Sequence, residues 1–330
     1  MLASVEVLAG DWAAALRRTF NVLDLAHRFG FTRAAAYALG CQALVFVRRG
    51  RLDEAADRVS AARRLFGKWS AADRHVFGLV DLVEGMIALA RHEVDHTVAL
   101  ANKAAHNPTI APLAFALLGE AQAVAGDMEA AQHTASRLAA LGPGAPYPAA
   151  LAAWVSGLAA GARRDPARAL GALNQLDSAV AGFAELGMPY EEAVARLDRA
   201  LVRRAAGHPA DAVASDVNGA LEVLDRLQAK PQADRARAVL RQLGRRPVTA
   251  SGDHEQRRLS AREEEVARLV AHGLSNAEVG ERLFITSRTV ATHLQHIYRR
   301  LELPSRAALI RYVLEELPAA EVTSRGGANK

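Results

Sequence analysis

The sequence is short of cysteine, aromatic residues and lysine, and each shortage excludes a class of structure. A single cysteine, Cys41, among 330 residues permits no disulfide within the chain and no cluster of thiolate metal ligands, which predicts a reducing compartment. Aromatic residues make up 5% of the chain and runs of β-branched residues are short, so signals for β-strands are nearly absent. Only four of the 41 basic residues are lysines.

The chain also lacks a long apolar run. The longest uncharged stretch lies between Arg137 and Arg163, and glycines and prolines interrupt it, which leaves 14 residues at 149–162. A helix needs about 20 apolar residues to cross a bilayer, so no membrane segment is expected. The first turns contain Glu6 and Asp11 and no basic segment, which argues against a signal peptide. These features predict a cytoplasmic protein.

The composition itself is ordinary for a globular chain of two or three domains, with 51% hydrophobic and 23% charged residues. A net charge of +5 and an isoelectric point of about 9.7 are compatible with a nucleic-acid ligand. The same excess equally fits a bias in coding composition, because it consists of arginine in an alanine-rich chain. The distribution of the charge is therefore more informative than its sum.

A short pattern recurs along most of the chain: a turn residue, a polar residue that can cap a helix, and a helix that opens on alanine. The copies lie at 10–15, 50–55, 126–131 and 207–212, with a degenerate copy at 164–169 and a weaker one near residue 91. Neighbouring copies are spaced by about 38 to 43 residues. This spacing predicts regular turns between antiparallel helices.

The segments between these turns carry apolar residues at helical spacing, as in 16–26 and 213–227. Alanine at the crossing points lets helices approach closely, which stacked hairpins need because each buries its apolar face only against its neighbours. Residues 1–243 resemble the tetratricopeptide class of α-solenoid, although the period departs from about 34 residues. The alternative is a non-repetitive all-α domain in which glycine turns recur by chance.

The apolar periodicity stops after residue 243. Residues 244–256 contain glycines and a proline among polar residues, which predicts a linker and a domain boundary. Residues 257–317 are dense in helix signals, and residues 318–330 predict a disordered tail.

The C-terminal segment predicts four short helices. Capping boxes at 260–263 and 275–278 mark two helix starts, Gly273 ends the first helix, and a turn at 284–286 leads to a third helix that opens at Ser287. The inward apolar residues are Val266, Leu269 and Val270, then Val279 and Leu283, then Val290, Leu294, Ile297 and Leu301, and in a fourth helix Leu309, Tyr312 and Val313. Four helices with a tight turn between the second and third predict a helix-turn-helix domain.

Positive charge is concentrated on the third of these helices. Residues 287–311 contain five arginines against Glu302, a local net charge of +4, whereas 254–286 carries −1. The face opposite its apolar stripe carries Ala291, Thr292, Gln295 and Arg299. Such small or hydrogen-bonding residues can enter a major groove, and the helix start at Ser287 and Arg288 offers backbone amides to a phosphate. This polarity predicts docking on double-stranded DNA.

A longer pattern runs through the same residues without gaps: Leu259-Ser-x-Arg-Glu-x-Glu-Val266, Gly273-Leu-Ser-Asn-x-Glu-Val279, Leu283-x-Ile-Thr-x-x-Thr-Val-x-x-His293 and Arg300-Leu-x-Leu-x-Ser-Arg306. It resembles the LuxR-type DNA-binding domain over residues 257–317. The resemblance implies that the third helix, 287–301, is the recognition helix and that the fourth helix supports a homodimer on two half-sites.

The resemblance also implies roles for individual residues. Base-facing positions are Ala291, Thr292 and Gln295; phosphate-facing positions are Asn276, Ser287, Arg288, Thr289, Arg299 and Arg300; the dimerisation helix contributes Leu309, Tyr312 and Val313. Many family members have lysine where this chain has Ala291, and often near Gln295, so two cations of the family pattern are absent here.

Helical repeats followed by this domain resemble the C-terminal half of the large ATP-binding LuxR-family regulators. The nucleotide-binding motif Gly-x-x-x-x-Gly-Lys-Ser/Thr does not occur, because 66–69 lacks the upstream glycine and the hydroxyl. The sequence therefore predicts neither an ATPase nor a cofactor. Whether the chain is a short regulator or part of a longer one stays open.

One motif favours a different class of protein. His92-Glu93-Val94-Asp95-His96 matches the zinc metalloprotease pattern, in which two histidines one helical turn apart bind the metal, and Glu120 is a conceivable third ligand. The competing interpretation is a polar turn, because the repeat period predicts a turn near 88–92. Trp12, Trp69 and Trp154 predict core packing, and the paired arginines at 17–18, 48–49, 63–64, 163–164 and 203–204 predict solvated helix ends.

The sequence thus predicts an all-α transcriptional regulator rather than an enzyme, with no metal site. The protein is predicted to bind DNA through 287–301, and its repeat domain is predicted to sense a small molecule or a protein; RNA polymerase is a further candidate partner. The alternative is a helical-repeat scaffold that the C-terminal domain tethers to DNA. The operator, the signal and the sign of regulation stay open.

Overall fold

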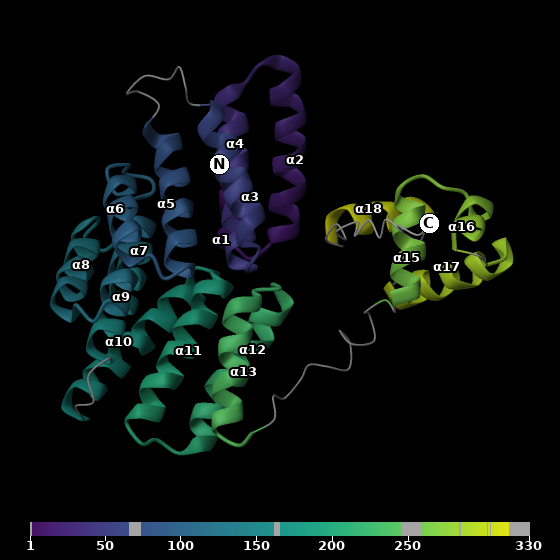
Figure 1. Cartoon of the computed structure of the whole chain (residues 1–330). Helices are drawn as coiled ribbons and strands as arrows, with labels where there is room; N and C mark the ends of the chain where they lie inside the picture. Colours follow the sequence, from purple (N-terminus) through teal and green to yellow (C-terminus); the bar gives the residue numbers. More distant parts are fainter. Residues whose placement is uncertain are drawn as a thin grey trace, which may run out of the picture. The chain divides into compact units, whose positions relative to one another are not determined.

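The protein is helical throughout the part that the computed structural model describes, which comprises residues 2–65, 74–161, 166–245, 259, 261–283, 285–301, 303 and 305–316. No strand occurs among these residues, which confirms the all-α prediction. The chain divides into two compact units, Met1–Pro247 and Val248–Lys330 (Figure 1). Apart from residues 244 and 245, the predicted linker and tail lie outside the described residues. None of the described helices combines the length and hydropathy of a membrane span.

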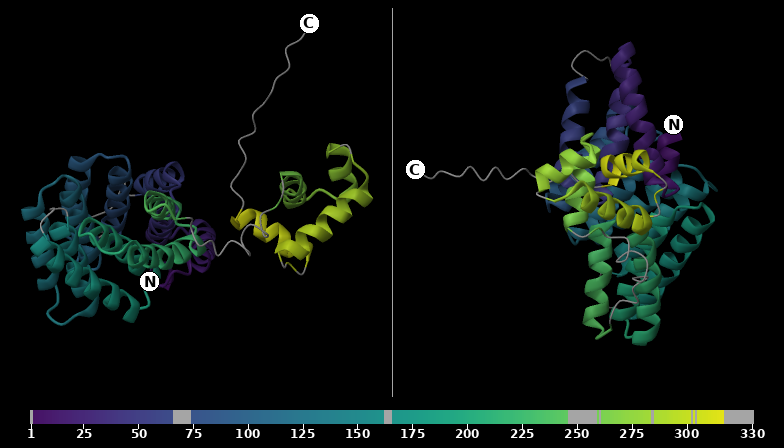
Figure 2. Two further views of the ribbon diagram at one scale, coloured as in Figure 1. Left: turned by 90° about the horizontal axis from the view of Figure 1, so that it is seen from below. Right: turned by 90° about the vertical axis from the view of Figure 1, so that its right-hand side faces the viewer.

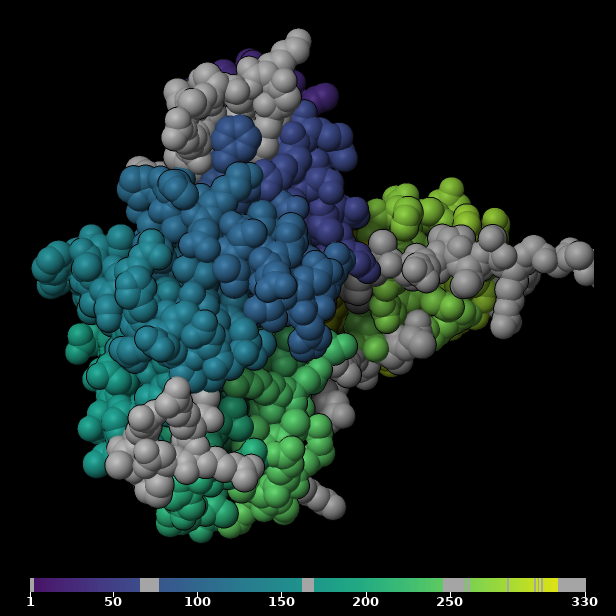
Figure 3. All heavy atoms as spheres, turned by 60° about the vertical axis from the view of Figure 1, so that its left-hand side comes forward, coloured from purple at the N-terminus to yellow at the C-terminus, as the bar shows by residue number. Residues whose placement is uncertain are grey.

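The first unit is an array of helical hairpins. Its helices are α1 (Leu2–Leu8), α2 (Trp12–Phe29), α3 (Thr32–Arg48), α4 (Leu52–Leu65), α5 (Arg74–Ala90), α6 (Val94–Ala104), α7 (Ala111–Val124), α8 (Met128–Ala140), α9 (Pro146–Gly161), α10 (Pro166–Glu185), α11 (Pro189–Ala205), α12 (Ala210–Arg226) and α13 (Lys230–Gln242). Consecutive hairpins lie side by side in chain order, as the colours in Figure 3 show.

The recurring glycines make the turns of these hairpins. Gly10, Gly50, Gly126 and Gly207 all have φ between 77° and 82°, a left-handed conformation that glycine adopts without strain. After two of these turns an aspartate caps the next helix: Asp11 accepts from the Ala14 amide at 2.9 Å, and Asp127 from the Ala130 amide at 3.0 Å. The degenerate copy at 164–169 begins outside the described residues. The repeat pattern thus identified the turns correctly.

Two layers of helices form the array. The odd-numbered helices α3, α5, α7, α9, α11 and α13 contact one another in succession, and α4, α6, α8, α10 and α12 each pack between two of them. Glycine permits the close approach at several crossings. A Cβ atom on Gly119 of α7 would lie 2.3 Å from Cγ1 of Val155 on α9, so no larger residue fits there.

The array also closes on itself. The start of α2 and the end of α3 contact the starts of α11 and α13, so the first hairpins reach the last ones (Figure 1 and Figure 2). The Trp12 and Tyr190 rings lie 5.5 Å apart, and a Cβ atom on Gly50 would lie 2.8 Å from Cγ of Pro231. One core cluster consequently runs from Ala3 to Leu240, and a second, smaller cluster joins Ala172, Leu173 and Leu176 of α10 to Val202 of α11.

Arg48 is buried at this closure, with 4% of its surface exposed, and it forms an ion pair with Glu191 of α11. The interpretation of the paired arginines as solvated helix ends is therefore wrong for Arg48. Arg63 is also paired, with Asp81 and Glu84 of α5, and Arg203 pairs with Asp216 at 2.7 Å. These arginines serve the packing of the array, whereas Arg17, Arg64 and Arg204 are exposed, as predicted for the paired arginines.

The first hairpin departs from the predicted stripe at 16–26. Leu16 and Ala26 are buried, but Phe20 is 47% exposed. Other large apolar side chains exposed on the same hairpin or just after it are Val5, Leu25, Phe29 and Phe31. In contrast, Val213, Val217, Leu221, Leu224 and Leu227 are all buried, as predicted.

The second unit has four described helices: α15 (Ala261–Ala271), α16 (Asn276–Leu283), α17 (Ser287–Leu301) and α18 (Arg306–Glu316). Its core consists of Val266, Ala267, Val270, Val279, Val290, Leu294, Ile297, Leu309 and Val313. Leu269, Leu283, Leu301 and Tyr312 pack around it and are partly buried. The apolar stripes predicted for these four helices are therefore confirmed.

Candidate nucleic-acid interface

Side-chain caps set where α16 and α17 begin. Ser275 and Glu278 form the predicted capping box: the Ser275 amide donates to the Glu278 carboxylate at 2.7 Å, and the Glu278 amide donates to the Ser275 hydroxyl at 3.4 Å. Hydrogen bonds from Ser275 lower the pKa of Glu278. At the start of α17, the Thr286 hydroxyl accepts from the Thr289 amide at 3.1 Å. The other predicted box begins at residue 260, outside the described residues.

The turn between α16 and α17 is held by Gly280. Its carbonyl accepts from the Ile285 amide at 2.9 Å, and a Cβ atom on Gly280 would lie only 2.6 Å from the Ile285 carbonyl oxygen. A side chain at this position would push the turn away from α16. Glycine therefore fixes the angle at which α17 leaves the turn, which the sequence pattern did not reveal.

Two arginines connect the helices of this unit. Arg262 of α15 donates to the Leu283 carbonyl at 2.6 Å, at the end of α16. Arg306 of α18 donates to the Asn276 side-chain oxygen at 2.8 Å and to the Leu274 carbonyl. The sequence counted Arg306 as part of the positive surface, whereas its guanidinium holds α18 against the start of α16. The feature of the sequence that marked Arg306 was its position at the end of the LuxR-like pattern at 300–306.

Helix α17 presents one apolar face and one polar face. Val290, Leu294 and Ile297 point into the core. The predicted binding residues Ser287, Arg288, Thr289, Thr292, Gln295 and Arg299 are exposed, and Ala291 is partly exposed. The helix contains no acidic residue, and Arg288 and Arg299 make no ion pair with any residue that the structure describes. Its outer face is consequently positive and accessible.

The start of α17 has the features of an anion site. The amides of Ser287 and Arg288 have no acceptor among the described residues. The Thr286 hydroxyl accepts from the Thr289 amide, and the Thr286 carbonyl accepts from the Val290 amide. An open depression beside them is lined by Ala277, Gly280, Glu281, Ile285, Thr286 and Ser287. Amides at a helix start favour a phosphate group.

Other predicted site residues have partners within the unit. The Thr292 hydroxyl donates to the Arg288 carbonyl at 3.1 Å, and the Asn276 oxygen accepts from Arg306. Leu309 and Val313 lie in the core, and Tyr312 packs at its edge. Arg300 belongs to α17, but its side chain lies outside the described residues.

The zinc-protease alternative fails on geometry. His92 lies in the turn between α5 and α6 with φ of 63°, Glu93 precedes α6, and only His96 lies on that helix. The two histidines are therefore not one turn apart on a single helix, and the polar-turn interpretation is confirmed. Within the described ranges, no group of three or more His, Cys, Asp or Glu residues is arranged to hold a metal ion.

Comparison with known proteins points to the same unit. Residues 257–313 match the family model described as bacterial regulatory proteins, luxR family. The chain is 52% identical over 52 residues to Rv0890c of Mycobacterium tuberculosis, which is named as an HTH-type transcriptional regulator; the match covers 16% of this chain and 6% of that protein. It is 42% identical over 58 residues to the oxygen regulatory protein NreC of Staphylococcus carnosus, and this match covers 18% of this chain and 27% of that protein.

The chain spans well under two thirds of the length of either relative. The matched segment coincides with the four-helix unit described above, from its capped α16 to its basic α17. Residues 257–313 thus form a LuxR-type helix-turn-helix DNA-binding domain.

Proposed function

We propose that this protein is a sequence-specific transcriptional regulator that binds double-stranded DNA through α17. The observation that carries the proposal is the exposed face of α17, which is positive and free of acidic residues on a domain whose other helices are fixed by caps and buried contacts. In this proposal residues 257–317 bind DNA, residues 244–256 link the two units, and residues 1–243 regulate the protein's activity.

In the proposed complex α17 enters the major groove, which is wide enough for one helix. Thr292 and Gln295 face the bases and can exchange hydrogen bonds with their edges, while Ala291 offers only a methyl group. Thr292 would exchange its bond to the Arg288 carbonyl for one to a base. Specificity is therefore assigned chiefly to Gln295.

The phosphates on either side are assigned to the helix start and to the arginines. The amides of Ser287 and Arg288 lie at the positive end of the helix dipole, which favours an anion. Thr289, Asn276, Arg299 and Arg300 complete the proposed phosphate contacts. Asn276 can contribute its amide group, because Arg306 already occupies its oxygen.

We assign dimerisation on DNA to α18. Leu309 and Val313 hold this helix in the domain core, so its contact with a second copy would use Ala307, Arg311 and the accessible part of Tyr312. The repeat array is the proposed receiver of a small-molecule or protein signal, and RNA polymerase is a proposed downstream partner.

The proposal is tested by selecting bound sites from random double-stranded DNA with the full chain. We expect an enriched motif with two half-sites and an affinity that falls steeply with salt, because arginine–phosphate contacts release counterions. Binding without an enriched motif would favour the alternative of a scaffold that is merely tethered to DNA.

A further inference from the structure

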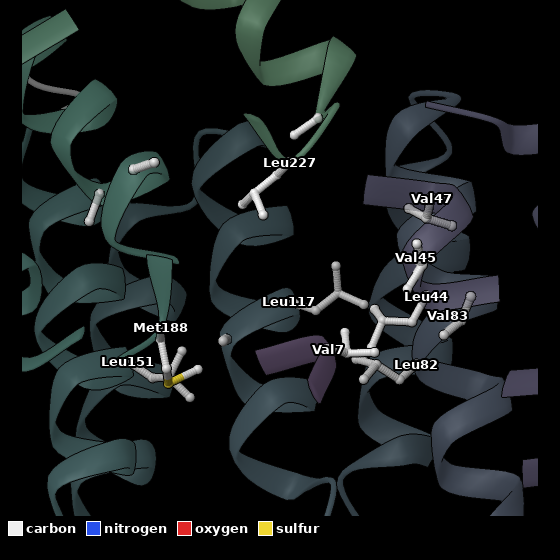
Figure 4. Close-up of a cluster of buried hydrophobic side chains, with 14 of the residues drawn as sticks. Val7, Leu44, Val45, Val47, Leu82, Val83, Leu117, Leu151, Met188 and Leu227 are labelled. Atoms are coloured by element: carbon white, nitrogen blue, oxygen red, sulfur yellow. The ribbon is translucent and has the colours of Figure 1, made fainter. Parts of the chain in front are cut away.

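A cavity of about 100 Å³ lies inside the helical array. Its wall comes from the odd-numbered helices α3 to α13 and from Phe183 of α10. Most of the wall is apolar; Figure 4 shows Leu44 and Leu117 pointing toward one another, with Leu82 nearby, from three neighbouring helices. A cavity of this order has room for a small organic molecule.

The cavity exists because the array closes on itself. Helices α3 and α11, which are far apart in the sequence, supply facing parts of the wall, and Arg48 and Glu191 pair across it. The Arg48 guanidinium carbon lies 4.5 Å from the centre of the Tyr190 ring. Arg48 Nε, Arg48 Nη1 and Glu191 Oε2 are buried without a hydrogen-bond partner among the described residues.

Glu120 is the third charged residue of the wall, besides Arg48 and Glu191. It makes no hydrogen bond or ion pair with any residue that the structure describes. The nearby Asp198 is already bound by Arg235 at 2.8 Å and by the Trp154 indole at 2.9 Å. A carboxylate in such a position is costly unless something compensates it.

The charges around the cavity do not balance. Among the described residues that line or adjoin the cavity, Arg48 and Glu191 neutralise each other, and so do Arg235 and Asp198, which leaves the ionised carboxylate of Glu120 in excess. The aromatic rings of Trp154 and Phe183 also line the wall, and ring faces attract cations, whereas the Tyr190 ring already contacts Arg48. An apolar wall with one surplus carboxylate matches an apolar molecule that carries one positive charge.

We propose that this cavity binds a small apolar amine whose ammonium group pairs with Glu120 and whose hydrocarbon part packs against the leucines and aromatic rings. If the array is the signal-receiving part of the regulator, as proposed above, such an amine is its effector. The site itself depends only on the array and not on DNA.

The test is calorimetric titration of the full chain, without DNA, at pH 8. Three probes of nearly equal shape are compared: 2-phenylethylamine, which is cationic, 2-phenylethanol, which is neutral, and phenylacetate, which is anionic. We expect the amine to bind at least tenfold more tightly than the alcohol, and phenylacetate to bind most weakly. Equal binding of amine and alcohol, or no amine binding at millimolar concentration, overturns the proposal.

Two variants locate the charge. Glu120→Gln is expected to reduce the affinity for the amine to that for the alcohol, and to leave the affinity for the alcohol unchanged. Glu222→Gln, on the exposed side of α12, should change neither affinity. An amine preference that survives Glu120→Gln rules out this site. If Glu120→Gln does not fold, the three probes on the unaltered chain still decide. Because no DNA is present, failure here leaves the DNA-binding proposal standing.

Discussion

The helical array and helix α17 use arginine in opposite ways. In the array, arginines pair with carboxylates of neighbouring helices: Arg199 contacts Asp177 and Asp216, each at 2.6 Å, and Arg48 is buried against Glu191. On α17, Arg288 and Arg299 are exposed and have no ion pair with a described residue. The same residue type therefore stabilises the fold in one unit and remains available to a ligand in the other, and a net charge cannot distinguish these uses.

The largest expected effect comes from breaking the buried pair in the array. Glu191→Ala leaves the Arg48 guanidinium buried without its carboxylate, so we expect a loss of about 3–5 kcal/mol in the stability of the array. Denaturant unfolding of the full chain, followed through the array's transition, measures it.

The matched control is the next residue in the chain. Glu192 pairs with Arg196 one turn away at 2.6 Å, and this pair is partly exposed, so Glu192→Ala should cost no more than about 0.5 kcal/mol. Similar losses in the two variants would contradict a structural role for the buried pair.

Glu120 adds a pH dependence to the array that α17 should not share. Burial, and then the charge of Asp198, raises the pKa of Glu120 to about 7 from 4.5, against the opposing effect of Arg235. The folded array therefore holds this proton more tightly than the unfolded chain does. Its contribution to stability is complete below pH 4.5 and is lost as the pH rises through 7.

We expect the stability of the array, relative to that of the Glu120→Gln variant, to fall by up to about 3 kcal/mol between pH 5 and pH 8. Taking the difference between the two chains removes the contributions of the other ionisable groups, which both chains share. If the stability of the array depends on pH in the same way in both chains, the prediction is contradicted.

On α17, replacing a residue that is proposed to face the bases tests the sequence specificity of DNA binding. Gln295→Ala removes an exposed hydrogen-bonding side chain, so we expect a loss of discrimination of about 1–3 kcal/mol at one base position. Competition binding with operator variants measures it. Gln132→Ala, on the exposed side of α8, is the control and should change no preference. An unchanged base preference in Gln295→Ala would remove this residue from the interface.

The smallest expected effect is on the salt dependence of DNA binding, and it is tested by replacing one arginine from each unit. Arg299→Ala should weaken binding to all DNA sequences alike and reduce the salt dependence by about one unit, because one phosphate contact is lost. Arg18→Ala removes the same charge from the array, where Arg18 pairs with Glu6 at 2.6 Å, and should leave the salt dependence unchanged. If both variants shift it equally, overall charge rather than α17 determines the affinity.

Much of the fold could be predicted because its signals are local. The turns at Gly10, Gly50, Gly126 and Gly207 require a left-handed residue, and the capping box at Ser275 is formed by residues three positions apart. The apolar stripe of α17 repeats at each helical turn, which defined both its buried face and the opposite, exposed one.

Other features escaped prediction because their partners are distant in the sequence. The LuxR-like pattern marked Arg306 but did not indicate that it binds Asn276, 30 positions earlier. The helical stripe of the first hairpin suggested a buried Phe20, which is exposed because no described helix covers that side of α2. The sequence around Gly280 did not indicate that the Ile285 carbonyl packs against this glycine.

The amino-acid order alone determined the helices, their turns, the two units and the charged face of α17, since each depends on residues within a few positions of one another. Only the tertiary structure decided that Arg48 is buried, that the array closes, and that Glu120 lies at a cavity without an ion pair to any described residue. Arg48 and Glu191 are 143 positions apart, and their meeting depends on how every hairpin between them packs against the next.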